Sequence, residues 1–117
     1  MPETKRPGSK AKQRQLQRRA RILRCVADIP KGRVSTYGSV GAACQTGPRQ
    51  AAAVLSLDPG ASDVPWHRVV GAGGLLRIVN PVGHKEQRER LIAEGLELTD
   101  RRVQAFDDVF VDMCDLE

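Results

Sequence analysis

The stretch VSTYGSVGAACQTGPRQAAAVLSL, residues 34–57, decides the fold. Ser35 or Thr36 can cap a first short helix, because a hydroxyl accepts a free backbone N–H of the opening turn. The residues at 46–48, Thr-Gly-Pro, predict a turn, and the proline suits the start of a second helix over 49–57, where its missing N–H costs nothing. Two short helices joined by a tight glycine-containing turn predict a helix-turn-helix.

Helical spacing continues upstream of this stretch. Apolar residues recur every three or four positions from residue 15 to residue 29, and Pro30 with Gly32 ends the helix that they predict. Residues 1–14 are polar, basic and interrupted by proline and glycine. We therefore expect a disordered basic arm over 1–14 and a single domain over 15–117.

Downstream, the glycine-rich stretch 71–74 predicts a β-hairpin whose second strand is 75–79. A charged helix is expected over 84–94, with Gly95 as its C-cap. A short strand is expected around 106–111. The expected fold is therefore mainly α: a winged-helix-like domain with a helix-turn-helix and a small β-hairpin.

The charge of the chain favours a polyanionic partner. The net charge is +5 and the pI is about 9.6, with positive charge concentrated before residue 34 and acidic residues gathered over 107–117. No apolar run approaches the roughly 20 residues of a membrane span, and no apolar segment follows the basic N-terminus as in a secretory signal. A cytoplasmic protein is expected, associated with the nucleoid when it binds DNA, and no membrane partner is expected.

The three cysteines do not predict a metal site or a disulfide framework. Cys25, Cys44 and Cys114 are odd in number and widely spaced, with no CxxC pair and no usual zinc spacing. Reduced thiols fit this pattern, and Cys25 and Cys44 are expected to be small buried hydrophobes. We expect neither a metal nor a cofactor.

One short motif is specific. PWHRVV, residues 65–70, resembles the Pro-Cys-His-Arg-Val active-site motif of the O6-alkylguanine-DNA alkyltransferases, with tryptophan in place of cysteine. It is similar to the Pro-Trp-His-Arg motif of the alkyltransferase-like proteins, the branch of that family without the nucleophile. IPKGRVSTYG, residues 29–38, and AEG, residues 93–95, resemble two further family motifs in the same order. The resemblance runs from about Ile22 to Leu98.

The resemblance implies a protein that rotates a damaged base out of the duplex into a pocket. Arg49 lies seventeen residues before Trp66, at the interval of the family's arginine finger, which enters the base stack from the minor groove. Tyr37 matches the tyrosine that helps to rotate the phosphate of the flipped nucleotide. The small residues of the second helix would allow a close approach to the narrow groove. The implied DNA-binding residues are Thr36, Tyr37, Gly38, Arg49, Gln50 and Ala52.

Trp66 would form a wall of the lesion pocket, where an indole offers apolar surface for an alkyl group and an N–H donor. Arg77 could reach the flipped base through a cation–π contact. The expected lesion-binding residues are Trp66, Tyr37, Arg49, Pro65, Val70 and Arg77.

His67 and Glu94 match the His and Glu of the alkyltransferase proton relay, in which the histidine draws the proton from the cysteine. With Trp66 at the cysteine position the relay has nothing to activate. We therefore expect His67 and Glu94 to be a structural remnant, with Arg68 in the same role, and no catalytic residue.

The chain also departs from the family pattern. The segment between Tyr37 and Arg49 is shorter than usual, so its turn must be tighter. Asp58 replaces the family's Asn hinge, and residues 76–81 lack its usual lesion-pocket side chains.

The function implied is that of a monomeric damage sensor. It would bind O6-alkylguanine in double-stranded DNA and flag the site for nucleotide excision repair proteins without removing the alkyl group. An active alkyltransferase that uses another cysteine is a first alternative, with Cys44 the nearest candidate, although a nucleophile needs a neighbouring base. A helix-turn-helix transcription factor is a second alternative, but the PWHRVV motif has no role in it.

Overall fold

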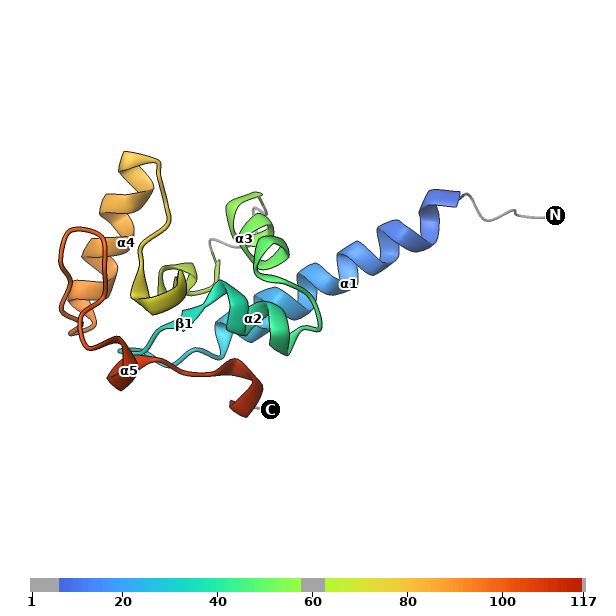
Figure 1. The fold of residues 1–117 in the computed structure, drawn as a ribbon. Helices are drawn as coiled ribbons and strands as arrows, with labels where there is room; N and C mark the ends of the chain where they lie inside the picture. Colours follow the sequence, from blue (N-terminus) through green and yellow to red (C-terminus); the bar gives the residue numbers. More distant parts are fainter. Residues whose placement is uncertain (1–6, 58–62, 117) are drawn as a thin grey trace.

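The computed structural model describes residues 7–57 and 63–116, and Figure 1 shows their arrangement. In chain order the elements are α1 (Pro7–Ala27), β1 (Ser35–Thr36), α2 (Tyr37–Ala43), α3 (Pro48–Leu57), η2 (Trp66–Arg68), β2 (Val69–Val70), η3 (Ala72–Gly74), α4 (Pro81–Ala93), α5 (Phe106–Val109) and η4 (Met113–Leu116), where η marks a 3₁₀ turn. The Asp58 position and residues 1–6 of the expected arm lie outside the described residues.

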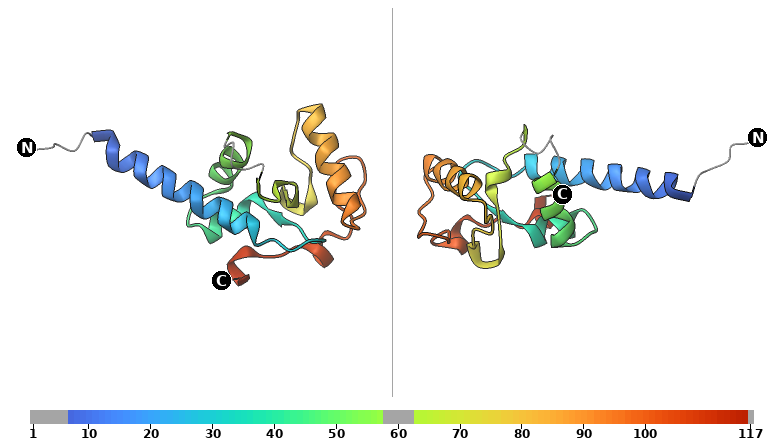
Figure 2. Two further views of the ribbon diagram at one scale, coloured as in Figure 1. Left: turned by 180° about the vertical axis from the view of Figure 1, so that it is seen from behind. Right: turned by 90° about the horizontal axis from the view of Figure 1, so that it is seen from above.

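Helix α1 is longer than the sequence predicts. It begins at Pro7 rather than near residue 15, so the expected disordered arm is helical from Pro7 onward. Beyond Gly8, the first turns consist of residues with good helix propensity, chiefly Lys, Arg, Gln and Ala. Ile22 and Val26 are buried, whereas residues 10–17 are exposed. Figures 1 and 2 show the N-terminal part of α1 projecting from the body, in a molecule that measures 60 × 31 × 20 Å.

Helices α2 and α3 form the predicted helix-turn-helix. Thr36 is the N-cap of α2, and its Oγ1 accepts a hydrogen bond from the backbone N–H of Ser39 at 3.0 Å. Helix α3 begins at Pro48, as its restricted φ favours. A Cβ added to Gly41 would lie 2.5 Å from the carbonyl carbon and oxygen of Gly47, so α2 and the turn pack backbone against backbone. The short connection therefore requires glycine at 41.

The small sheet differs from the expected hairpin. Strands β1 and β2 pair in parallel, with Ser35 opposite Val69 and Thr36 opposite Val70. The glycine-rich stretch folds into η3, and the N–H of Gly71 donates to the carbonyl of Leu75 at 2.7 Å. This turn directs Leu75 away from β2 and into an isolated antiparallel bridge with Arg102. The predicted hairpin was therefore wrong, although a two-stranded sheet is present.

The expected strand around 106–111 is also wrong. Its first part is the short helix α5, whose first turn holds Asp107 and Asp108, where negative charge suits the helix dipole. Phe110 then makes a single parallel bridge to Val34. The N–H of Val34 donates to the carbonyl of Val109 at 2.9 Å, so the C-terminal segment runs beside the approach to β1.

Two clusters of buried side chains form the core, one on each side of β2. Val69 belongs to the cluster under α1, α2 and α3, whereas Val70 belongs to the cluster under α4. Successive strand residues point to opposite faces, so this dipeptide joins both clusters. No helix in the described part of the chain is both long and apolar enough to cross a membrane.

Helix α4 confirms the expected charged helix but starts three residues earlier, at Pro81. The side chain of Asn80 caps it by accepting from the backbone N–H of Val82 at 2.9 Å. At the other end Gly95 has φ +95°, the left-handed conformation that ends many helices. The N–H of Leu96 then bonds back to the carbonyl of Leu91 at 3.1 Å. This cap holds Glu94, the last residue before Gly95, in a defined position.

Candidate nucleic-acid interface

A cavity of about 850 Å³ lies between the helix-turn-helix and the segment 71–80. This volume is within the range of small-molecule sites. The cavity brings together six of the residues that the sequence predicted, from three separate parts of the chain: Thr36, Tyr37, Gly38, Arg49, Ala52 and Arg77. Its remaining lining includes Ile78 and Val79, which no sequence motif predicted.

Tyr37 is the first residue of α2 and is largely covered. Burial raises the pKa of its phenol, and the positive charge of Arg77 opposes this rise only in part. The phenol therefore stays protonated and can donate a hydrogen bond at the cavity wall. An aromatic ring with a protonated hydroxyl suits contact with a nucleotide's phosphate.

Arg49 is the second residue of α3 and is exposed at the cavity edge. Its position near the helix N-terminus adds its charge to the positive end of the helix dipole, which favours an anionic neighbour. Ala52 lies one turn further along the same helix and also lines the cavity. A long cation beside a small side chain suits close approach to a nucleic-acid groove.

Arg77 comes from the opposite wall, and its place depends on a glycine. A Cβ added to Gly71 would lie 2.7 Å from the Cγ of Arg77, so the absent side chain makes room for the arginine stem. Gly71 follows β2 directly and itself lines the cavity. The PWHRVV motif therefore leads straight into the cavity wall.

Trp66 lies on η2 and is half-buried, but it is not among the described residues that line this cavity. Its indole packs edge-to-face with the imidazole of His67, with ring centroids 6.1 Å apart. The guanidinium carbon of Arg90 lies 5.5 Å from the indole centroid. The indole is thus held between α4 and the next residue of its own motif.

Three other predicted residues also lie outside the cavity lining. Pro65 is the N-cap of η2, and Val70 is fully buried in the core. Gln50 serves the turn, because its Oε1 accepts a hydrogen bond from the backbone N–H of Gly47 at 3.2 Å.

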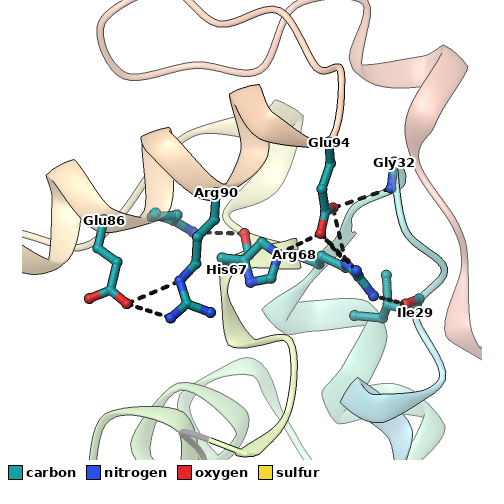
Figure 3. A network of polar contacts seen from close by, with 8 residues as sticks. Ile29, Gly32, His67, Arg68, Glu86, Arg90 and Glu94 are labelled. Atoms are coloured by element: carbon teal, nitrogen blue, oxygen red, sulfur yellow. Dashed lines mark hydrogen bonds and ion pairs between the residues drawn. The ribbon is translucent and has the colours of Figure 1, made fainter.

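Glu94 is the centre of a buried polar network (Figure 3). Its Oε2 lies 2.9 Å from Nε2 of His67, and the same oxygen accepts from Nη2 of Arg68 at 2.7 Å. Its Oε1 accepts from Nε of Arg68 at 3.0 Å and from the backbone N–H of Gly32 at 3.2 Å. Arg68 in turn donates to the carbonyl oxygen of Ile29 at 2.7 Å. The network ties α4 to η2 and to the loop before β1.

The electrostatics of this network hold Glu94 as a carboxylate and His67 as a neutral ring. Burial alone raises the pKa of Glu94, but hydrogen bonds from Arg68, His67 and Gly32 outweigh it and bring the pKa to about 2. Burial lowers the pKa of His67, and the hydrogen bond to Glu94 opposes this. Nδ1 of His67 is buried and has no hydrogen-bond partner among the described residues. The network therefore keeps the relay's His–Glu contact.

Two residues of α4 that no sequence motif predicted, Gln87 and Arg90, contact the PWHRVV motif. Nε2 of Gln87 donates to the carbonyl oxygens of His67 and Val69 at 3.2 and 3.1 Å, and its side chain is completely buried. Arg90 contacts the Trp66 indole. Gln87 precedes the buried Leu91 by four positions, so its place on the inner helix face was available from the spacing.

The cysteines lie away from the cavity. Cys44 is buried in the first core cluster, Cys25 is half-buried, and Cys114 is exposed on η4. None of them lines the cavity at the helix-turn-helix. In the described part of the chain, no group of three or more His, Cys, Asp or Glu side chains is placed to hold a metal ion.

Comparison with known proteins matches residues 17–96 to the family model of the 6-O-methylguanine DNA methyltransferase DNA-binding domain. The DNA base-flipping protein of Escherichia coli K12 is 41% identical over 78 residues, which are 65% of this chain and 60% of that protein. Alkyltransferase-like protein 1 of Schizosaccharomyces pombe is 32% identical over 82 residues, which are 67% of this chain and 75% of that protein. The match thus spans less than two thirds of the bacterial relative's length.

Solved structures share the fold. S. pombe Atl1, in complex with damaged DNA containing O6-carboxymethylguanine, superposes with a TM-score of 0.72 at 24% identity, covering 81% of this chain and 94% of that one. The O6-methylguanine methyltransferase of Mycobacterium tuberculosis gives 0.57 at 28% identity, covering 65% and 47%. The family match, the PWHRVV motif with Trp66 at the cysteine position and the shared fold show that the chain belongs to the O6-alkylguanine-DNA alkyltransferase family, in its alkyltransferase-like branch.

Proposed function

We propose that this protein binds O6-alkylguanine in duplex DNA from the minor groove, flips the base and leaves the alkyl group in place. The observation that carries the proposal is the single cavity in which Tyr37, Arg49 and Arg77 meet at the helix-turn-helix. Relatives named for base flipping and a structural neighbour bound to O6-carboxymethylguanine DNA support it.

Each side chain has a physical task in this proposal. Arg49 enters the base stack in place of the flipped base, and its contacts offset part of the few kcal/mol that unstacking costs. Tyr37 hydrogen-bonds the phosphate of the rotated nucleotide, and Arg77 faces the flipped base. The apolar surface of Ile78 and Val79 covers the alkyl group, at about 0.8 kcal/mol per buried CH₂.

Trp66 does not line this cavity, and it is proposed as a further wall that the lesion meets once the base is flipped. It lies five residues before Gly71, which lines the cavity, and its half-buried indole presents apolar surface and an N–H donor. Because neither indole carbon nor N–H is a practical acceptor for an alkyl group, the protein acts as a sensor. The persistent, bent complex then marks the site for nucleotide excision repair proteins.

The test compares binding to matched duplexes with and without one O6-methylguanine, followed by digestion of the DNA and mass spectrometry of the protein. We expect selective binding, with the methyl group recovered on guanine. A methyl group on a protein sulfur would instead support the alternative that uses another cysteine. Binding that follows base sequence and ignores the lesion would support the transcription-factor alternative.

Two fluorescence signals distinguish base flipping from contact between the flipped base and Trp66. A 2-aminopurine placed beside the lesion should brighten when the neighbouring base leaves the stack. Trp66 is the sole tryptophan, so its fluorescence should change on binding only if the flipped base reaches the indole. A bright 2-aminopurine with an unchanged tryptophan would support flipping and exclude Trp66 as the pocket wall.

A further inference from the structure

The outer part of α1 carries positive charge that the candidate site does not use. Over its 21 residues α1 has no Asp or Glu. Its cations are Lys10, Lys12, Arg14, Arg18, Arg19, Arg21 and Arg24. The nearest acidic residue along the described chain, Asp28, follows the C-terminus of the helix and is remote from its outer part.

Most of these cations share one face of the helix. At 3.6 residues per turn, five of them fall within about a third of the helix circumference. We call this set the basic stripe: Lys10, Arg14, Arg18, Arg21 and Arg24. It runs for about 21 Å along the helix, at 1.5 Å per residue. The other two cations, Lys12 and Arg19, point to the opposite side.

The outer half of the stripe stands away from the body. Residues 10–17 are exposed, and the buried positions of α1 begin only at Ile22. Lys10, Arg14 and Arg18 are spaced four apart, an arrangement in which like charges repel and weaken a helix. No ion pair of these three with an acidic side chain is described in residues 7–57 and 63–116. A bound polyanion would relieve that repulsion.

The inner end of the stripe lies at the helix-turn-helix. Arg21 and Arg24 line a second cavity, of about 620 Å³, together with Asp28, which follows α1, and with Cys44 and Gln45, which follow α2. The chain then turns through Gly47 into α3, which carries Arg49. Figure 1 shows α1 leaving the body beside α2 and extending beyond it. The stripe therefore begins beside the end of α2, two residues before the turn that leads to Arg49, at a cavity separate from the one that Arg49 lines.

We propose that the basic stripe of α1 binds phosphates of the duplex outside the lesion site. The proposal rests on the proposed function for the placement of the duplex at α2 and α3. At 3.4 Å per base pair, about 21 Å corresponds to about six base pairs of backbone. Such contacts hold the protein on DNA without reading sequence, which suits a search for rare lesions.

Duplex DNA fits this stripe better than a membrane surface. A helix that lies in a membrane interface needs a broad apolar face beside its basic one. In the exposed part of α1, Leu16 is the only large apolar side chain. The regular spacing of long cations, without an apolar stripe, instead matches the repeating phosphates of a nucleic acid.

The test uses a triple variant, Lys10→Gln with Arg14→Gln and Arg18→Gln, in the full chain. The control variant removes three exposed cations elsewhere: Lys12→Gln, Lys31→Gln and Lys85→Gln. Glutamine retains helix propensity, so α1 should still form. Affinity is measured by fluorescence anisotropy over a range of salt, on a long duplex that extends well past the stripe and on a short duplex that ends near the lesion.

We expect the triple variant to bind the long duplex about tenfold more weakly, with or without a lesion, and to bind the short duplex like the wild type. The slope of log affinity against log salt on the long duplex should fall by about 2 to 3, because three phosphate contacts are lost. The control variant should change the affinity for the long duplex and the salt slope much less than the triple variant does.

Three outcomes would contradict the proposal that the basic stripe binds DNA. They are an unchanged affinity and slope on the long duplex, an equal loss on the short duplex, or an equal loss in the control. If the triple variant loses binding to phosphatidylserine vesicles but binds DNA like the wild type, the stripe binds a membrane instead. If the wild type fails to prefer the lesion while the stripe-dependent slope persists, the proposed function fails and the stripe stands.

Discussion

The guanidinium carbon of Arg90 lies 5.5 Å from the centroid of the Trp66 indole ring. Arg90 also pairs with Glu86, one turn earlier on α4, at 2.7 Å. The carboxylate orients the guanidinium, and the guanidinium covers the indole, in a contact of about 0.5–1 kcal/mol at such an exposed site. The residue at the family's cysteine position is therefore held by α4.

Arg90→Ala should loosen the indole. We expect faster local motion of Trp66 in its time-resolved fluorescence anisotropy and a loss of lesion affinity of about two- to fivefold, the equivalent of that contact. Lys85→Ala, also exposed on α4, is the control and should leave both unchanged. If Arg90→Ala leaves the indole motion as it was, Arg90 does not hold Trp66.

Arg49→Ala should weaken binding to a lesion duplex by about one to two orders of magnitude, because the unstacked site loses the side chain that replaces the base. Lys31→Ala removes an exposed cation away from the cavity and serves as the control. The measurement is anisotropy at constant salt. Equal affinities of the wild type and Arg49→Ala would place the finger at another residue.

Glu94→Gln should destabilise the fold by about 3 kcal/mol, because it leaves the Arg68 guanidinium without its counter-charge in a mostly buried site. Glu86→Gln is the matched control on the same helix. Its pair with Arg90 is about half exposed, so a change below about 1 kcal/mol is expected. Urea unfolding measures both free energies, and similar values for the two variants would contradict a structural role of the Glu94 network.

The same network predicts a pH dependence. The pKa of Glu94 is about 2 in the folded protein against an ordinary 4.5, so between these values the unfolded chain binds more protons. The contribution of Glu94 is complete above pH 4.5 and is lost as the pH falls toward 2. The difference in unfolding free energy between wild type and Glu94→Gln should shrink across that window. A difference that stays constant down to pH 2.5 would show that the pKa is not lowered.

Gly41→Ala should cost about 1–3 kcal/mol of stability, because its Cβ would meet the Gly47 carbonyl at 2.5 Å and backbone cannot give way as a side chain can. Gly38→Ala in the same helix is the control, since the nearest atom to its Cβ is 3.9 Å away. Thermal unfolding of both variants tests this. Equal melting temperatures of the two variants would mean that α2 and the turn can move apart without a loss of stability.

The helix-turn-helix was predictable because its signals are local. The Thr36 cap and Pro48 at the start of α3 act within one turn of the residues that carry them. The prediction of a hairpin was wrong because β2 pairs with β1, more than thirty residues upstream. The pattern of the glycines does not encode that partner. The glycines instead close a 3₁₀ turn.

The candidate site was predictable only in part. The resemblance supplied Tyr37 and Arg49, and the structure places both at one cavity. The opposite wall of that cavity, with Ile78 and Val79, depends on how η3 redirects the chain after β2, which is a tertiary effect. Arg90 was missed because only the packing of α4 on η2 brings it to the indole.

The C-terminal segment holds β1 and α2 from far along the chain. The backbone N–H of Met113 donates to Oγ of Ser39 at 2.7 Å, and Oγ of Ser35 donates to the carbonyl of Val111 at 2.7 Å, across sequence separations of 74 and 76 residues. At about 5–20 residues per second, a ribosome needs about 4–15 s to make that interval. During each round of synthesis, α2 is therefore made several seconds before the C-terminal residues that hydrogen-bond to it.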